Sequence, residues 1–342
     1  MTDWWAFKPV TTAFEKTKKL LLSPFNVWTW IKLIVIVFFV GGATRFGSQF
    51  TNVFNYGDSM SSPARYTNDV NNFLSNSNLL MILVALFLII LVIAIIMAYL
   101  RNVFAFVFIK ALATGDVHVI KPALGNLGRG FKLFVVTLLI GLFTLIVALV
   151  LVLVMIACVL IAIKTGVAGA AAILLVLLLA LIFMVSLVLL IAFCLIMAIV
   201  MGFIYDFAAP MMFFRGMGAI QACKHVYGLA KKEWKQFGVY VLTRWVLELF
   251  VGIFVGIISI LVLLVYVALL VIGVILAVEA MKTSVVIAAL VGICIVIGTL
   301  VFIAILLLIA MPVSVYFRYY SLDMLKQADP SAVQYSGKIG TQ

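Results

Sequence analysis

Long apolar runs separated by short polar stretches dominate the pattern of hydrophobic and polar positions along the chain. Uncharged runs of this length exceed what a helix in a soluble core needs, and they are typical of helices that cross a membrane. The runs lie at about 28–46, 79–109, 133–163, 167–205, 237–278 and 284–317. The pattern predicts an all-α, polytopic membrane protein with six transmembrane helices in a single membrane domain over residues 1–342.

Three shorter stretches combine apolar and basic residues with the three-to-four spacing of an amphipathic helix. Their apolar faces are expected to include Val10, Ala13, Phe14, Thr17 and Leu20 in the first stretch, Ile120, Leu124 and Phe131 in the second, and Ile220, Cys223, Val226 and Tyr227 in the third. Lys16 and Lys224 fall on the opposite faces. We expect each helix to lie in the headgroup plane, with its apolar face toward the acyl chains and its cations on anionic phosphates.

These stretches and runs recur at a regular interval. Lys110, Arg215 and Arg318 each close an apolar run, at spacings of 105 and 103 residues, and Lys132 and Lys235 are also 103 residues apart. The self-similarity predicts an internal repeat, in which each unit contains an amphipathic helix at the inner surface and then a hairpin of two spans. The predicted units cover about 1–110, 111–215 and 216–318.

Composition and charge add an orientation to this picture. The chain is 67% apolar and 10% charged, with a formal net charge of +12. Of the 23 Lys and Arg residues, the segments that would face outward hold Arg45, Arg65, Lys164 and Lys282. By the positive-inside rule we expect a multi-pass protein of the cell (cytoplasmic) membrane with both termini in the cytoplasm, an extracytoplasmic polar loop at 47–78 and a cytoplasmic tail at 319–342. Because the basic residues flank hydrophobic spans, anionic membrane lipids are the expected partners and nucleic acid is not.

Charged residues at the edges of spans are the first candidates for a functional site, because charge inside a membrane is costly. Arg101 and Asp206 occupy equivalent places in two repeat units with opposite sign, which predicts an ion pair between the second and fourth spans. Arg244 and Glu248 are four residues apart and can pair on one face of the fifth span. In the alternative interpretation the inner membrane boundary runs near these residues, and they are interfacial packing pairs on helices that continue into the cytosolic layer.

A second set of candidates consists of basic residues at the inner surface that could bind lipid headgroups. The set is Lys110, Arg129, Lys132, Arg215, Lys231, Lys232, Lys235 and Arg318. The sequence contains no phosphate-binding loop, zinc-protease, nucleophile-elbow or paired-carboxylate motif, and its four cysteines lack ligand-like spacing. It therefore predicts no enzymatic activity, no cofactor and no metal site.

Four segments resemble a known group of proteins. They are "AFEKTKKLLLSPFNVWTWIKL", "RNVFAFVFIKAL", "DFAAPMMFFRGMGAIQACK" and "MPVSVYFRYYSLDML". The group consists of uncharacterised archaeal and bacterial six-span membrane proteins, a domain of unknown function distantly like the membrane domain of some glycerophosphodiester phosphodiesterases. The resemblance covers most of the chain, and it implies a fold and a membrane location without an established activity.

The longest apolar runs exceed the thickness of a membrane. The uncharged runs 133–163 and 167–205 contain 31 and 39 residues, whereas about 20 residues cross the hydrocarbon core. Such helices either bend or protrude as a bundle that neighbouring subunits or lipid cover. We expect association, and thus a non-enzymatic scaffold that forms a homo-oligomer or belongs to a membrane complex. The alternative is a transporter or lipid-handling protein with an apolar cavity and basic headgroup-binding residues.

Overall fold

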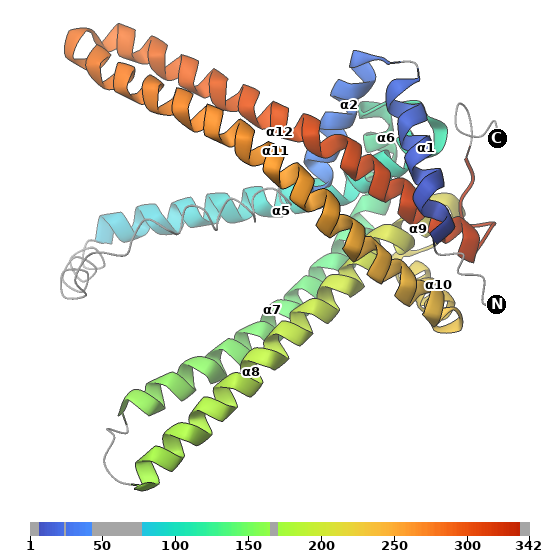
Figure 1. The fold of residues 1–342 in the computed structure, drawn as a ribbon, viewed down its shortest axis with the longest axis horizontal. Helices are drawn as coiled ribbons and strands as arrows, with labels where there is room; N and C mark the ends of the chain where they lie inside the picture. Colours follow the sequence, from blue (N-terminus) through green and yellow to red (C-terminus); the bar gives the residue numbers. More distant parts are fainter. Residues whose placement is uncertain (1–6, 24, 43–76, 165–169, 336–342) are drawn as a thin grey trace. The chain divides into compact units, whose positions relative to one another are not determined.

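The computed structural model describes residues 7–23, 25–42, 77–164 and 170–335, and every regular element in these ranges is a helix (Figure 1). The all-α class is therefore confirmed. The elements are α1 (Lys8–Leu22), α2 (Val27–Val37), the π-helix η2 (Phe38–Gly42), α5 (Ser77–Thr114), α6 (Ile120–Gly125), α7 (Leu127–Lys164), α8 (Ala170–Phe203), the π-helix η3 (Ile204–Ala208), α9 (Ala209–Arg215), α10 (Ala219–Lys232), α11 (Trp234–Thr283) and α12 (Val285–Ala328). Nearly all of the predicted loop at 47–78, residues 165–169 around the start of the fourth predicted span and the last seven residues of the predicted tail lie outside the described residues.

Five helical segments in the described part of the chain are long and apolar enough to cross a membrane. They are Met81–Thr114, Leu127–Ile163, Leu174–Arg215, Trp234–Lys282 and Val285–Ala328. These segments identify a membrane protein by length and composition. The apolar helix at Val27–Gly41, where the first of six spans is predicted, is shorter than the other five.

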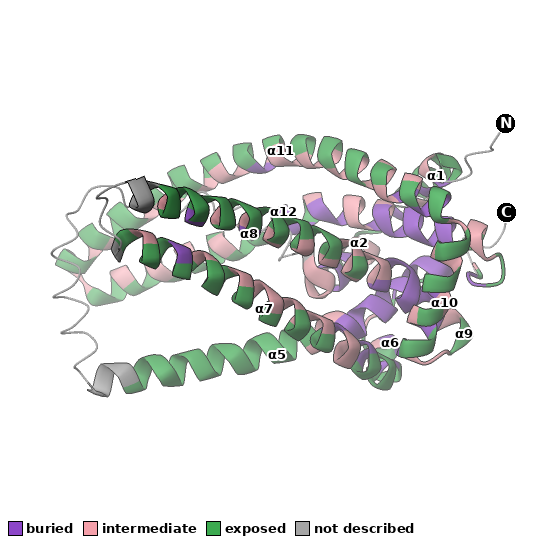
Figure 2. Ribbon diagram, turned by 90° about the horizontal axis from the view of Figure 1, so that it is seen from below, coloured by how far each residue is buried: buried purple, intermediate pink, exposed green. Residues whose placement is uncertain are grey.

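The chain divides into two compact units. Unit 1 comprises residues 1–130 and 233–342, and unit 2 comprises residues 131–232. In unit 1 the core lies at one end of the long helices, where α1, α2, η2 and the second halves of α5 and α12 pack together. Figure 2 shows this core by burial: buried residues gather at the packed end of the long helices, and exposed residues follow the rest of α5, α11 and α12.

Each long helix of unit 1 thus has a packed part and an exposed part. In α12, residues 285–305 include no buried residue, whereas most of residues 306–325 are buried. In α5, residues 81–97 are exposed, and burial begins at Asn102. We call the packed parts of these helices, together with α1, α2 and η2, the base of unit 1, and the exposed parts its arms.

Specific local contacts build the base around α2. Asn26 caps α2, since its side-chain oxygen accepts a hydrogen bond from the backbone N–H of Trp28 at 2.9 Å. The indole Nε1 of Trp30 donates to the Leu21 carbonyl at 2.9 Å and so ties α2 to the end of α1. In η2, the Phe39 ring stacks on Phe104 of α5 with ring centroids 4.4 Å apart.

The helix α1 packs on α12 with much of the expected apolar face, including Ala13, Thr17 and Leu20, but two other residues are placed differently from the expectation. Its buried residues are Pro9, Ala13, Thr17, Leu20 and Leu21. Phe14, which was expected on the apolar face, is 64% exposed, and Lys16, which was expected on the outer face, is directed into the protein. This part of the prediction is wrong because α1 packs against protein, where Lys16 meets an acidic partner on α12.

The arms of unit 1 include a helical hairpin. Ser284 alone separates α11 from α12, and the two helices lie side by side (Figure 1). Near the middle of the arm the hydroxyls of Tyr266 and Thr299 are 2.8 Å apart, and the Tyr266 ring stacks on Phe302 with centroids 4.2 Å apart. A Cβ atom on Gly273 would lie 3.1 Å from the Ile295 side chain, so the two helices approach closely there.

Unit 2 contains the other hairpin, formed by most of α7 and by α8. Phe143 and Phe193 pack edge to face between the two helices, with centroids 6.2 Å apart. At its C-terminal end α8 widens into η3, just before Pro210 at the start of α9. Proline lacks an N–H and displaces the carbonyl of the preceding turn, so a π-turn is a reasonable accommodation. Gly216, with φ of 65°, ends α9 and leads into α10.

A close approach in unit 1 provides a test of this packing. A Cβ atom on Gly130, in the first turn of α7, would lie 2.5 Å from Cγ2 and 2.9 Å from Cα of Val103 in α5. Gly130→Ala should therefore lower the free energy of unfolding by about 1–3 kcal/mol. Gly128→Ala is the matched control, because a Cβ atom at Gly128 meets nothing within 4 Å. Thermal unfolding in detergent measures both, and equal melting temperatures for the two variants would contradict the close contact.

Candidate functional site

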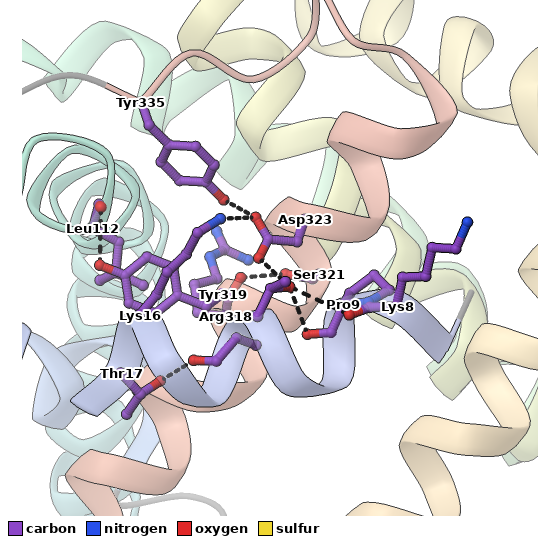
Figure 3. Close-up of polar contacts among 12 residues, drawn as sticks. Lys8, Pro9, Lys16, Thr17, Leu112, Arg318, Tyr319, Ser321, Asp323 and Tyr335 are labelled. Atoms are coloured by element: carbon purple, nitrogen blue, oxygen red, sulfur yellow. Dashed lines mark hydrogen bonds and ion pairs between the residues drawn. The ribbon is translucent and has the colours of Figure 1, made fainter. Parts of the chain in front are cut away.

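The densest polar cluster in the described part of unit 1 surrounds Asp323, near the end of α12 (Figure 3). Lys16 Nζ lies 2.5 Å from one carboxylate oxygen, Oδ1, and the hydroxyl of Tyr335 donates to the same oxygen at 2.5 Å. Thr12 donates to the other oxygen, Oδ2, at 3.1 Å. We call these four residues the Asp323 cluster. They join the N-terminal helix to the C-terminal end of α12.

Secondary structure brings the four residues of this cluster together. Thr12 and Lys16 are one helical turn apart on α1, so both face α12. Tyr335 returns toward Asp323 after a turn that begins at Asp329, whose carboxylate accepts a hydrogen bond from Ser331 Oγ at 2.7 Å. Ala332 and Val333 are fully buried in this turn and anchor it to the base.

Because the Asp323 cluster is largely buried, its two charges must remain paired in the folded protein. The side chains of Lys16 and Asp323 are 14% and 6% exposed, so each charge depends on the other. The Lys16 ammonium also lies 4.0 Å from the centroid of the Tyr335 ring, and Lys326 lies 5.2 Å from it. Burial raises the pKa of the Tyr335 phenol well above its usual value, and the charge and hydrogen bond of Asp323 raise it further. The phenol therefore remains a proton donor at neutral pH.

A second polar group in unit 1 centres on Arg244 of α11. Its Nε is 3.0 Å from Glu248 Oε1, and its Nη1 donates to the Tyr240 hydroxyl at 2.8 Å. The Tyr240 ring stacks on Tyr320 of α12 with centroids 5.1 Å apart. This arrangement fixes the first turns of α11 on the base through both charge and aromatic packing.

The other predicted pair is divided between the two units. Arg101 belongs to α5 in unit 1, and Asp206 is buried in η3 of unit 2. An ion pair between them stays a prediction. Arg101 and Asp206 each lie where the helix passes from an exposed stretch into a buried one.

Seven of the eight predicted headgroup-binding residues are exposed. These are Lys110, Arg129, Lys132, Arg215, Lys231, Lys232 and Lys235. Arg129 donates to the Asn126 side chain at 3.1 Å, and Arg215 Nη1 lies 3.3 Å from His225 Nε2. Arg318 differs, because it is 8% exposed in the base, so its guanidinium is part of the protein interior.

Unit 2 contains an apolar groove beside the amphipathic helix α10. The groove has a volume of about 600 Å³, and α7, α8, η3 and α10 contribute its walls. Among the described residues, no three His, Cys, Asp or Glu side chains come together as metal ligands would. The chemical possibilities at the described sites are thus ionic anchoring at Asp323, surface attraction of anions, and burial of an apolar ligand.

Sequence reasoning missed the Asp323 cluster. Lys16 and Asp323 are 307 residues apart. Each lies in a segment that carries the family resemblance, but nothing in either segment indicates that the two residues pair. A signal was nevertheless present, because an acid near the end of the last apolar run is unusual in a chain with only 11 acidic residues.

The Asp323 cluster predicts a strong effect of removing its acid. Asp323→Ala leaves Lys16 in the protein without its counter-charge, which should lower the free energy of unfolding by about 3 kcal/mol. Lys16→Met should be less harmful, since Thr12 and Tyr335 still donate to the carboxylate. The double variant Lys16→Met/Asp323→Ala should lose less free energy of unfolding than the two single variants lose together.

The matched control is the exposed pair Lys282–Glu279, with its atoms 2.7 Å apart. Glu279→Ala should change the free energy of unfolding by less than about 0.5 kcal/mol. Thermal unfolding in one detergent compares the two sites directly. Equal losses at Asp323 and Glu279 would show that the buried pair does not stabilise the base.

Tyr335 predicts a dependence on alkaline pH. Because its pKa is raised in the folded protein, the stability that it contributes is complete below the ordinary tyrosine pKa of about 10 and is lost as the pH rises above that value. Tyr335→Phe should be less stable than the parent by about 2 kcal/mol at pH 8, and the difference should narrow at pH 11. Melting temperatures across this range measure it, with the exposed Tyr227→Phe as control. If the difference in stability between Tyr335→Phe and the parent protein is the same at pH 8 and pH 11, the raised pKa of Tyr335 is refuted.

Comparison with known proteins gives one match. No curated protein and no solved structure is similar enough to the chain to count as a match. A family model does match residues 4–333, which is nearly the whole chain. The protein therefore belongs to a family of unknown function, DUF7544.

Proposed function

We propose that the protein is a non-enzymatic scaffold of the cell membrane that assembles with copies of itself or with partner chains. The observation that carries this proposal is the division of unit 1 into a packed base and apolar arms. The arms expose large side chains such as Phe87, Phe250 and Phe254. Such an extensive apolar surface must be covered by lipid or by other helices. A packed base that presents several apolar arms to other helices is what we expect of a subunit in a membrane assembly.

The lengths of the arms support a membrane boundary at the edge of the base. The exposed stretch 285–305 of α12 contains 21 residues, which span about 31 Å as a helix, close to the hydrocarbon thickness of about 30 Å. The remainder of α12 is then accommodated in a cytosolic layer of protein. This supports the interfacial interpretation for Arg101, Arg244 and Glu248.

The proposed topology has six spans, with α2 and η2 as the first. The apolar helix there is short, but Leu33, Ile36 and Val37 are buried, so protein covers it in place of lipid. An even number of spans puts both termini on one side, and the Asp323 cluster agrees with this because it bonds the N-terminal helix to the C-terminal turn. The positive-inside rule assigns that side to the cytoplasm.

The element order supports the proposed threefold repeat. Each of the elements α1, α6 and α10 precedes two apolar helices: α2 and α5 follow α1, α7 and α8 follow α6, and α11 and α12 follow α10. The seven exposed cations then form a basic collar on the cytoplasmic leaflet, where they attract anionic lipid headgroups. Arg318 is excluded from the collar by its burial.

Native mass spectrometry of the protein in lipid nanodiscs tests the scaffold. We expect a discrete oligomer or a complex with partner chains. Gly252→Leu/Gly256→Leu should reduce the subunit number, because a Cβ atom at either glycine meets nothing within 4 Å and the pair forms a face on which another helix could approach closely. Gly141→Leu on α7, also open to 4 Å, is the matched control. A single chain in the parent protein and in all variants would overturn the proposal.

A lipid-handling role is the second candidate. It is favoured by an apolar groove of about 980 Å³ along α11 and α12, which runs past Tyr266, Gly273 and Gly298. This volume suits a small apolar ligand. Movement of fluorescent phospholipid between the leaflets of proteoliposomes, faster than in protein-free vesicles, would favour this role over the scaffold.

A further inference from the structure

The apolar groove of unit 2 lies where an inner-surface helix meets a membrane hairpin. Its walls include Ile140 of α7, Phe203 of α8, and Ile220 and Tyr227 of α10. Its volume of about 600 Å³ is in the range of small-molecule pockets. Of the residues that line it in the described part of the chain, Lys224 alone carries a charge. A hydrophobic groove with one cation matches a ligand that is apolar along its length and anionic at one end.

The helix α10 leaves part of its apolar face uncovered at this groove. Ile220 and Tyr227, seven residues apart and so on one side of the helix, are 66% and 71% exposed. Ala222 and Val226 of the same helix are buried. The packing of α10 within unit 2 therefore covers only one part of its apolar surface, and an occupant of the groove would cover more of it.

The charge of α10 is of one sign. The helix contains Lys224, Lys231 and Lys232 and no acidic residue. Arg215, at the end of α9, lies 3.3 Å from His225 of α10 and adds a further cation to the same end of the unit. A basic amphipathic helix of this kind belongs at the boundary between acyl chains and phosphates.

We propose that this groove binds one acyl chain of an anionic phospholipid, with Lys224 holding the phosphate. The inference rests on the proposed topology only in assigning the lipid to the cytoplasmic leaflet, and it does not depend on the oligomeric state. Charge argues against a helix from a second copy as the occupant. The exposed Lys110 and Arg215 lie at the ends of two long apolar helices of this chain, so such a helix would bring like charge toward Lys224.

Native mass spectrometry with added phosphatidylglycerol tests the site, with phosphatidylcholine as the neutral comparison. We expect one phosphatidylglycerol retained per chain and a weaker retention of phosphatidylcholine. Lys224→Gln should lower the affinity for phosphatidylglycerol about fivefold, whereas Lys232→Gln, whose lysine does not line the groove, should change it less. Ala230→Phe, which places a ring in the groove, should abolish retention.

Equal affinity for the two lipids, equal effects of Lys224→Gln and Lys232→Gln, or full retention in Ala230→Phe would each overturn the proposal. So would retention of a second copy in place of lipid. Because lipid retention in detergent does not depend on membrane orientation, a wrong topology leaves these results unchanged. Failure of the site and failure of the proposed topology are therefore distinguishable.

Cys223 supplies a second measurement should Ala230→Phe fold poorly. Its thiol lines the groove, and burial raises its pKa, so maleimide labelling is measured at pH 8.5. In a variant with Cys158, Cys194 and Cys294 replaced by alanine, phosphatidylglycerol should slow the labelling of Cys223 more than phosphatidylcholine does. Lys224→Gln should remove that difference. Labelling that is unaffected by either lipid contradicts the site.

Discussion

A helix of 44 residues cannot be contained in a hydrocarbon layer about 30 Å thick, because α12 extends for about 66 Å. Unit 1 meets this constraint by dividing its long helices. One part of α12 remains apolar and exposed, and the other part is buried by α1, α2 and α5. The positions of the core and of the buried charged residues of this unit agree with that division.

The base can contain charge because protein, and not lipid, surrounds it. Asp323 is 5% exposed, yet it accepts hydrogen bonds from three side chains. Arg244 is satisfied by Glu248 and Tyr240 in the same way. Buried charges that are paired add little net stability compared with apolar packing, but they disfavour other arrangements of the same helices. In unit 1 they fix α1 and the first turns of α11 on α12.

The sequence predicts the helical class and the membrane location because apolar runs of this length have few other uses. It also predicts the amphipathic helices α1 and α10, since their period is local. The second predicted stretch is divided between the short α6 and the start of α7. For α1 the predicted burial is confirmed at Ala13, Thr17 and Leu20. It is wrong at Phe14 and Lys16, because α1 packs against α12. Partners far apart in the chain, such as Lys16 and Asp323, depend on tertiary packing and leave no periodic signal. The sequence pattern also does not predict the π-helix η3, which lies just before Pro210.

The depth of α12 in the membrane is the measurement that tests the division into arm and base most directly. Spin labels on single cysteines at the exposed positions Val286, Val296, Leu308 and Lys326 report depth from their relative accessibility to oxygen and to a polar nickel complex. We predict the greatest depth at Val296, shallow positions at Val286 and Leu308, and an aqueous environment at Lys326. A label at Leu308 as deep as that at Val296, with a membrane environment that continues to Lys326, would contradict the account.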